Sequence, residues 1–123
     1  MAAPAQWLGL ARRAGRAAVG RQACRLALRS GRTALVVVAH EVSPAAHRYW
    51  ARSARQAGAA FAVWGSRELL GRAVGVRLAG VVAVCDREMA SNFLAAVNGC
   101  TMRAVAGRSG VMSIEEDSGL PAG

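Results

Sequence analysis

Features of membrane proteins and of metal sites are scarce in this sequence. No apolar run approaches the ~20 residues that a membrane-spanning helix needs, so we expect no membrane partner. The three cysteines stand far apart with no Cys-x-x-Cys pair, and the two histidines have no further ligands at metal-binding spacing. We therefore expect neither a disulfide framework nor a metal site.

Motifs that support catalysis are also missing. Gly71 and Gly75 lack the Gly-x-Gly turn of a dinucleotide site, and the sequence has no Gly-Lys-Ser/Thr stretch to hold a nucleotide phosphate. Cys85 beside Asp86 has no positioned base, so a strand end followed by a helix cap is the simpler interpretation. We expect a protein that is not an enzyme and needs no cofactor.

The sequence has few acidic residues, and all of its basic side chains apart from histidine are arginines. The sequence has 16 cationic and seven acidic residues, a formal net charge of +9 and a pI near 11.5. Codon bias can explain arginine in place of lysine, but not the surplus of positive charge. Such a surplus is typical of proteins that bind polyanions, above all nucleic acids. A membrane surface is a weaker alternative, because no helix pairs a basic face with a broad aromatic one.

Helical patterns alternate with short apolar runs along residues 1–99, which we predict to form one domain. This alternation indicates an α/β protein whose buried sheet is covered by helices on both faces. Residues 100–123 are rich in Gly and Ser and hold the acidic cluster Glu115, Glu116 and Asp117, so we interpret them as a flexible tail. The opening residues lack the long apolar segment of a secretory signal, so we expect a cytoplasmic protein, and a monomer. Helices are predicted over residues 5–14, 21–30, 44–57, 66–75 and 86–99, and strands over 17–19, 34–39, 60–64 and 80–85.

The helix over residues 21–30 is the most informative segment. At ~100° per residue, Cys24, Ala27 and Leu28 share a side that can face a core. The opposite side is polar and cationic, and the helix start directs free backbone N–H groups past Gly20. Such a face suits a folded polyanion, and structured RNA is the predicted partner. The outward residues are Gln22, Arg25, Leu26 and Arg29.

Three segments, in this order, resemble the kink-turn-binding ribosomal protein family of the archaeal-type seven-Ae and thirty-e large-subunit proteins. The first is Ala-Arg-Arg-Ala-Gly-Arg at 11–16, followed by Gly20 and the basic helix. The second is Leu-Val-Val-Val-Ala-His-Glu-Val-Ser-Pro at 35–44, and the third is similar to the family's Leu-Gly-x-Ala-x-Gly signature, at 65–76. The resemblance covers residues 6–97, and residues 8–15 are most similar to the bacterial YlxQ-like branch.

The resemblance implies a three-layer α/β/α sandwich around a mixed sheet of about four short strands, which binds structured RNA, with the ribosome as a candidate assembly. In the family, the helix after the glycine offers Asn, Glu and Lys to a kinked RNA, and Gln22, Ala23 and Leu26 stand there in this sequence. These replacements remove a carboxylate and a cation that read the kink, whereas phosphate contacts can maintain general affinity. The loop at 76–78 supplies a second contact. The complete predicted RNA-binding set is Arg12, Arg13, Arg16, Gly20, Arg21, Gln22, Arg25, Leu26, Arg29, Glu41, Val42, Val76, Arg77 and Leu78.

Two alternatives stay open from the sequence. One is a protein-interaction module of the ribosome or of the transcription or translation machinery that has lost RNA specificity, with Leu26 as its contact. The other concerns aromatic residues: we expect the tryptophans to pack internally, although Trp50 could stack on a base if it is exposed. Arg48, Arg52 and Arg55 are expected to form a solvated helix face that points away from the RNA site.

Overall fold

The computed structural model describes residues 3–101, which form five helices around a four-stranded sheet. Helices and strands alternate along these residues, as the sequence predicts. The helices are α1 (Pro4–Arg13), α2 (Arg21–Ser30), α3 (Pro44–Gln56), α4 (Arg67–Val74) and α5 (Arg87–Thr101). The strands are β1 (Ala17–Val19), β2 (Leu35–Val38), β3 (Ala60–Val63) and β4 (Val81–Val84).

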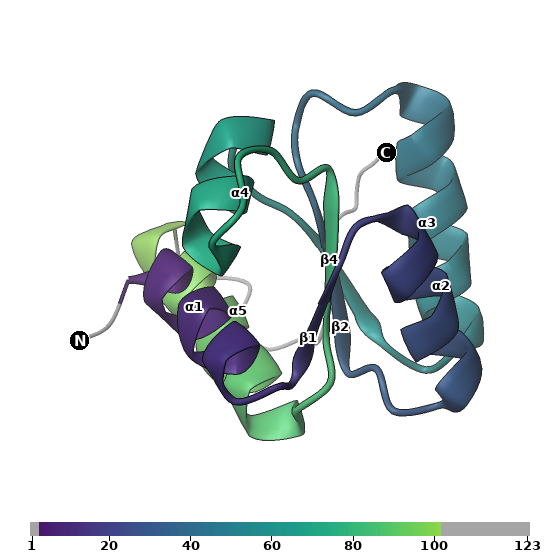
Figure 1. Ribbon diagram of the computed structural model, residues 1–123, viewed down its shortest axis with the longest axis horizontal. Helices are drawn as coiled ribbons and strands as arrows, with labels where there is room; N and C mark the ends of the chain where they lie inside the picture. Colours follow the sequence, from purple (N-terminus) through teal and green to yellow (C-terminus); the bar gives the residue numbers. More distant parts are fainter. Residues whose placement is uncertain (1–2, 102–123) are drawn as a thin grey trace.

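The sheet is mixed, with strand order β1-β4-β2-β3. Strand β4 pairs antiparallel with both β1 and β2, whereas β2 and β3 are parallel. The ends of β1, β2 and β3 therefore lie at the same edge of the sheet as the start of β4. We call this the upper edge, as it appears in Figure 1. Helices α2, α3 and α4 all begin there, so their N-termini gather at that edge.

The fold is a three-layer α/β/α sandwich. Helices α1, α4 and α5 cover one face of the sheet, and α2 and α3 cover the other (Figure 1). Each face of the sheet has its own hydrophobic core, and alternate residues of the central strand β2 belong to different cores. Leu35 and Val37 belong to the core under α1, α4 and α5. Val36 and Val38 belong to the core under α2 and α3. Every residue of β2 is buried, which explains the unbroken apolar run at this position in the sequence.

Short polar side chains fix the starts of three helices. The hydroxyl of Ser43 accepts a hydrogen bond from the Ala46 amide, and that of Ser66 accepts one from the Leu69 amide. The carboxylate of Asp86 accepts one from the Met89 amide. These N-caps confirm the three starts that the sequence predicts.

The largest shift of a single helix end is at the C-terminus of α5. The sequence predicts that this helix ends at 98–99, whereas α5 continues to Thr101. Asn and Gly favour helix ends by local conformational preference, but that preference does not end α5 at this point. The predicted acidic tail lies outside the described residues, apart from the end of α5.

Candidate nucleic-acid interface

The start of α2 forms an open donor site at the upper edge. The Gly20 amide donates to the Val81 carbonyl at 3.0 Å, which anchors the turn to β4, and the Gly20 carbonyl accepts from the Cys24 amide. Gly20 has φ 94° and ψ 163°, a conformation that is essentially restricted to glycine. As a glycine it has no side chain to cap the first turn. The residues around this turn line a shallow hollow: Val19, Gly20, Arg21, Gln22, Ala23 and Arg25.

The side chains of α2 divide into two faces. Cys24 is fully buried, and Ala27 and Leu28 pack against the core cluster to which Cys24 belongs. Arg21, Gln22, Arg25, Leu26 and Arg29 are all exposed, Leu26 to 58%. The division into an inner and an outer face follows the sequence-based expectation. An exposed leucine between arginines gives the outer face a small apolar contact within a cationic surface.

Two loops lie at the same edge as the α2 turn. The Ala39 amide donates to the Gly80 carbonyl, which joins the loop after β2 to the loop before β4. A side-chain Cβ placed on Gly80 would lie 3.2 Å from Cγ1 of Val42, so these two residues are close neighbours. Leu78, in the loop before β4, is 50% exposed. The structure thus places Val42 and Gly80 side by side at the edge that contains Gly20, and the exposed Leu78 is two residues before Gly80.

Glu41 has a structural contact within the chain. Its Oε1 accepts a hydrogen bond from the Arg67 amide at 2.6 Å, at the first residue of α4. A carboxylate at a helix N-terminus interacts favourably with the helix dipole. Glu41 therefore connects the loop after β2 to α4 and helps to hold the upper edge together.

The arginines at the end of α1 lie apart from this edge. The Arg16 carbonyl accepts from the Cys85 amide, at the end of β4 opposite to Val81, and the Arg16 guanidinium pairs with Asp86 at 3.4 Å. The Arg12 guanidinium donates to the Val74 carbonyl at 2.9 Å, at the C-terminal end of α4. The sequence predicts Arg12, Arg13 and Arg16 as part of one RNA surface with α2, but the fold separates them from the α2 N-terminus by the length of a strand.

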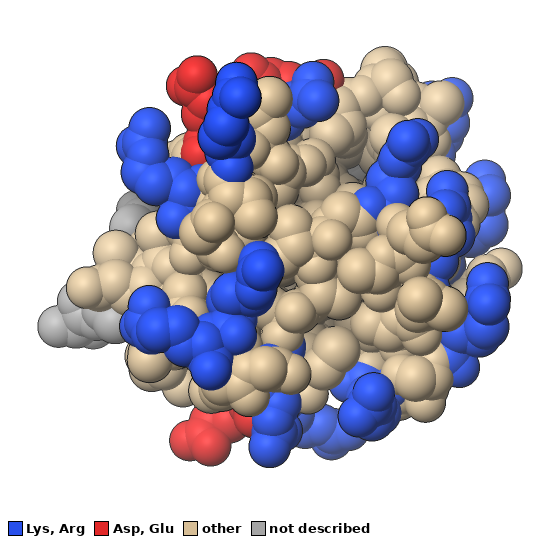
Figure 2. Space-filling view, in the orientation of Figure 1, with Lys and Arg blue, Asp and Glu red and all other residues tan. Residues whose placement is uncertain are grey.

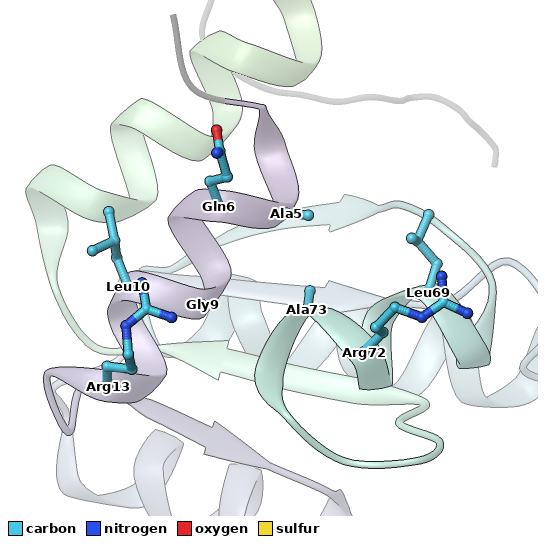
Figure 3. Close-up of a pocket in the computed structure, with 8 residues that line it drawn as sticks. All are labelled: Ala5, Gln6, Gly9, Leu10, Arg13, Leu69, Arg72 and Ala73. Atoms are coloured by element: carbon cyan, nitrogen blue, oxygen red, sulfur yellow. The ribbon is translucent and has the colours of Figure 1, made fainter.

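Arg13 lines a separate groove between α1 and α4. Figure 3 shows Leu10 and Arg13 projecting from α1, Leu69 and Arg72 projecting from α4, and Gly9 and Ala73 between the two pairs. Leu10 is 40% exposed and Leu69 is 37% exposed. The groove is on the opposite side of the sheet from α2, so Arg13 does not share a surface with Gln22.

Tyr49 on α3 contacts the candidate surface and was not singled out by the sequence. The Nε of Arg25 donates to the Tyr49 hydroxyl at 3.2 Å, and the Arg25 guanidinium carbon lies 5.9 Å from the centre of the tyrosine ring. Tyr49 is 40% exposed, whereas its neighbour Trp50 is 3% exposed. Trp50 is therefore a core residue and not a stacking platform. Successive helical residues point ~100° apart, so a buried Trp50 implies that its neighbour Tyr49 points away from the centre of the core. The sequence offers no other signal for the position of Tyr49.

Burial dominates the chemistry of Cys24, the titratable group with the clearest perturbation. Desolvation raises the pKa of its thiol to about 12, and the nearby Cys85 adds to the rise, while a backbone hydrogen bond from Ala83 acts against it. The Cys24 Sγ lies 3.4 Å from the Ala18 carbonyl. A neutral thiol in this position is a packing group of the α2 core face.

Within residues 3–101, no three His, Cys, Asp or Glu side chains gather where they could hold a metal ion. None of the helices in this part of the chain is long and apolar enough to cross a bilayer. The described residues therefore present a candidate binding surface built from arginines, backbone N–H groups and small apolar side chains.

Comparison with known proteins identifies relatives of this fold. A family model described as Ribosomal protein L7Ae/L30e/S12e/Gadd45 family matches residues 2–94. No curated protein matches the chain. A solved structure described as a protein with unknown function from Bacillus halodurans superimposes with a TM-score of 0.73 at 24% sequence identity, over 80% of this chain and 99% of that one. At that identity the likeness extends to the fold alone.

Proposed function

The chain belongs to the ribosomal protein L7Ae/L30e/S12e/Gadd45 family, and from this premise we propose that it is a non-enzymatic protein that binds structured RNA through the upper edge of its sheet. Membership of a family of RNA-binding, ribosomal-type proteins supports the substrate class. The observation that carries the proposal is the uncapped start of α2, where Gly20 leaves backbone donors open beside Gln22 and Arg25. Anionic groups bind well at such helix starts.

The surface divides into two contacts. Arg21, Gln22 and Arg25 offer cationic and amide donors to phosphates and base edges at the α2 turn. Arg77 and Leu78, both exposed, offer a cation and an apolar contact to an unstacked base from the loop before β4. The loop containing Val42 lies beside the loop before β4, to which it is joined by the hydrogen bond from the Ala39 amide to the Gly80 carbonyl.

Phosphate contacts provide most of the affinity in this proposal. Ala23 and Leu26 stand where a carboxylate and a cation are expected from the resemblance, so fewer groups are available to read a kinked RNA. Each charge-assisted contact to a base is worth about 1–3 kcal/mol of discrimination. We expect a preference for kink-turn RNA that depends on Gln22 and on residues 76–78.

Arg12, Arg13, Arg16 and Arg29 have a secondary place in the proposal. Arg12 contacts the Val74 carbonyl and Arg16 contacts Asp86 within the chain. All four arginines lie away from the α2 turn. They remain predicted phosphate contacts for parts of an RNA that extend beyond the upper edge. We further propose a monomer that acts in the cytoplasm as a ribosome-associated protein of the YlxQ-like branch.

The test is a titration with a kink-turn RNA and with a plain duplex of equal length, at several salt concentrations. Binding that weakens steeply with salt establishes phosphate-led recognition. A kink-turn preference of ~100-fold, or about 2.7 kcal/mol, establishes that the remaining groups read the kink. The proposal is overturned if neither RNA binds at low salt.

A paired set of variants locates the surface. Arg21→Gln combined with Arg25→Gln removes two cations from the α2 turn and should weaken binding to both RNAs by ~10-fold or more. Arg72→Gln combined with Arg87→Gln makes the same change of charge on α4 and α5 and should have a much smaller effect. Equal losses in the two variants would contradict the placement of the site on α2.

The exposed Leu26 favours one competing function, a contact with a protein of the ribosome or of the transcription or translation machinery. Capture of partners from a lysate distinguishes the two functions if it is repeated after nuclease treatment. Partners that are lost with the RNA support direct RNA binding. Partners that persist, and that are lost with Leu26→Ser, would support the protein-interaction module.

A further inference from the structure

Charge is segregated between the two helical layers. Helix α2 contains Arg21, Arg25 and Arg29, helix α3 contains Arg48, Arg52 and Arg55, and neither helix contains an acidic residue. The acidic residues in the described part of the chain lie elsewhere: Glu41 in a loop, Glu68 on α4, Asp86 before α5 and Glu88 on α5. In Figure 2 the right-hand border, which corresponds to α2 and α3, is blue without red.

The arginines of α3 form a single outward row. Their positions, i, i+4 and i+7, place them on one face of the helix, and all three are exposed. Trp50 and Ala54, which are buried, occupy the opposite face of α3 and pack toward the sheet. The row therefore points away from the core along most of the length of α3.

Helix α3, which carries this row, lies in the same layer as α2 (Figure 1). Both helices pack on the same core cluster, through Cys24 of α2 and Trp50 of α3, and both start at the upper edge (Figure 1). Arg25 contacts Tyr49 across the junction between them. The cationic surface thus continues from the α2 turn onto α3, and none of the acidic residues in the described part of the chain belongs to either helix.

Among residues 3–101, none of these six arginines forms an ion pair with a carboxylate, because the ion pair in this part of the chain is Arg16–Asp86. Unpaired cations side by side repel one another, so a surface of this kind gains stability from an anionic partner. The exposed large apolar side chains on this face are Leu26 and Tyr49. Protein interfaces usually contain an apolar core depleted in charge, which this face lacks.

From these observations we infer that the outer face of α2 and α3 binds the phosphate backbone of an RNA duplex that continues from the RNA held at the upper edge. Arginine binds phosphate through a planar set of donors, and a row one turn apart offers successive contacts along a strand. The inference rests on the proposed function for its partner class, and it adds a second, sequence-independent binding surface centred on Arg52 and Arg55.

The experiment compares two RNAs that share the same kink-turn and differ in the length of one flanking stem, short or long. Each stem is lengthened in turn, since only the one that passes over α3 is affected. Wild-type protein should bind one of the long-stem RNAs more tightly than the short-stem RNA, and its affinity for that long-stem RNA should depend more steeply on salt. Arg52→Gln combined with Arg55→Gln should abolish that gain and lower the salt slope by about 1.4 to 1.8, while short-stem binding is unchanged.

The matched control is Arg72→Gln combined with Arg87→Gln, which removes two exposed arginines from the other helical layer. It should retain the long-stem gain. If the α3 variant also retains the gain and the wild-type salt slope, the inference is overturned, which is the result expected if α3 binds an acidic protein.

Failure of this inference and failure of the proposed function are seen in different measurements. The α3 variant affects only the added stem, whereas the proposed function is tested by the loss of short-stem binding in Arg21→Gln combined with Arg25→Gln. Short-stem binding of wild-type strength in the α2 variant contradicts the proposed function, whatever the α3 variant does.

Discussion

Arg25 and Tyr49 join the two helices of one layer: the Nε of Arg25 donates to the tyrosine hydroxyl at 3.2 Å, and the guanidinium lies near the ring face. A guanidinium has five N–H donors, so this one bond leaves donors for a phosphate. The pair therefore orients Arg25 without using up its capacity to bind. Tyr49 acts in this arrangement as a positioning residue for the proposed RNA surface.

Tyr49→Phe should weaken RNA binding by about threefold, because it removes a hydrogen bond worth roughly 0.5–1.5 kcal/mol and leaves Arg25 free to adopt other rotamers. The ring remains, so the free energy of unfolding should change by less than about 0.5 kcal/mol. Fluorescence anisotropy with labelled RNA measures the first quantity, and urea denaturation measures the second.

Arg25→Gln provides the comparison for this prediction. If Tyr49 acts through Arg25, adding Tyr49→Phe to Arg25→Gln should cause no further loss of affinity. A further loss of the same size as in the single variant would show that the hydroxyl contacts RNA independently of Arg25.

Gly71→Ala should destabilise the fold and displace the loop before β4. A Cβ at this position would lie 2.9 Å from backbone atoms of Arg77 and Leu78, and backbone cannot yield as a flexible side chain does. We expect a loss of about 1–3 kcal/mol in the free energy of unfolding, together with weaker RNA binding through the displaced residues 77 and 78.

Arg72→Ala, in the same helix, is the control for Gly71→Ala, because Arg72 is exposed and alanine favours a helix. Its stability should stay close to wild type. Chemical denaturation of the two variants in parallel checks this difference, and equal stabilities would contradict the close contact between α4 and the loop.

Gly20→Ala should also destabilise the protein, for a different reason. Nothing lies within 4 Å of a Cβ at this position, so the cost comes from the backbone conformation at φ 94° and ψ 163°. Such a conformation costs a residue with a side chain about 1–3 kcal/mol. The added methyl group also enters the hollow at the α2 turn, so RNA affinity should fall at temperatures where the variant stays folded.

Gly15→Ala separates these two effects. Gly15 has φ 73° and open space around its Cβ, but it lies in the turn between α1 and β1. Both variants should lose stability in thermal unfolding, while only Gly20→Ala should change RNA affinity. An unchanged affinity in Gly20→Ala would place the RNA away from this turn.

The sequence predicted the elements well because the relevant signals are local. The unbroken apolar run of β2, the caps at Ser43 and Ser66 and the glycines around α2 each act within a few residues. The two helical layers then follow from the alternation of helices with buried strands. The end of α5 differs, because the helix continues to Thr101 although Asn98 and Gly99 favour a helix end by local preference.

The contacts of the site were harder to predict, because they join residues that are far apart in the sequence. The sequence gives no sign that Arg12 and Arg16 have partners within the chain, but in the fold Arg12 contacts Val74 and Arg16 contacts Asp86. Similarly, Tyr49 becomes part of the candidate surface only because α3 lies beside α2. A single sequence carries no periodicity or spacing that specifies such long-range pairs.

Cys24 should make the stability of the protein fall at alkaline pH. Burial raises the pKa of its thiol to about 12 from an ordinary value of 9.0, so the folded state retains a proton that the unfolded state releases. Between these two values the unfolded state binds fewer protons, and the free energy of unfolding therefore decreases as pH rises. The contribution is fully present below pH 9 and is lost toward pH 12, at up to about 1.4 kcal/mol for each pH unit.

Urea denaturation from pH 8 to 11 measures this decline, which Cys24→Ala should largely abolish. Cys85→Ala retains the buried thiol of Cys24 and should keep the decline. A decline of equal size in Cys24→Ala would assign it to another group.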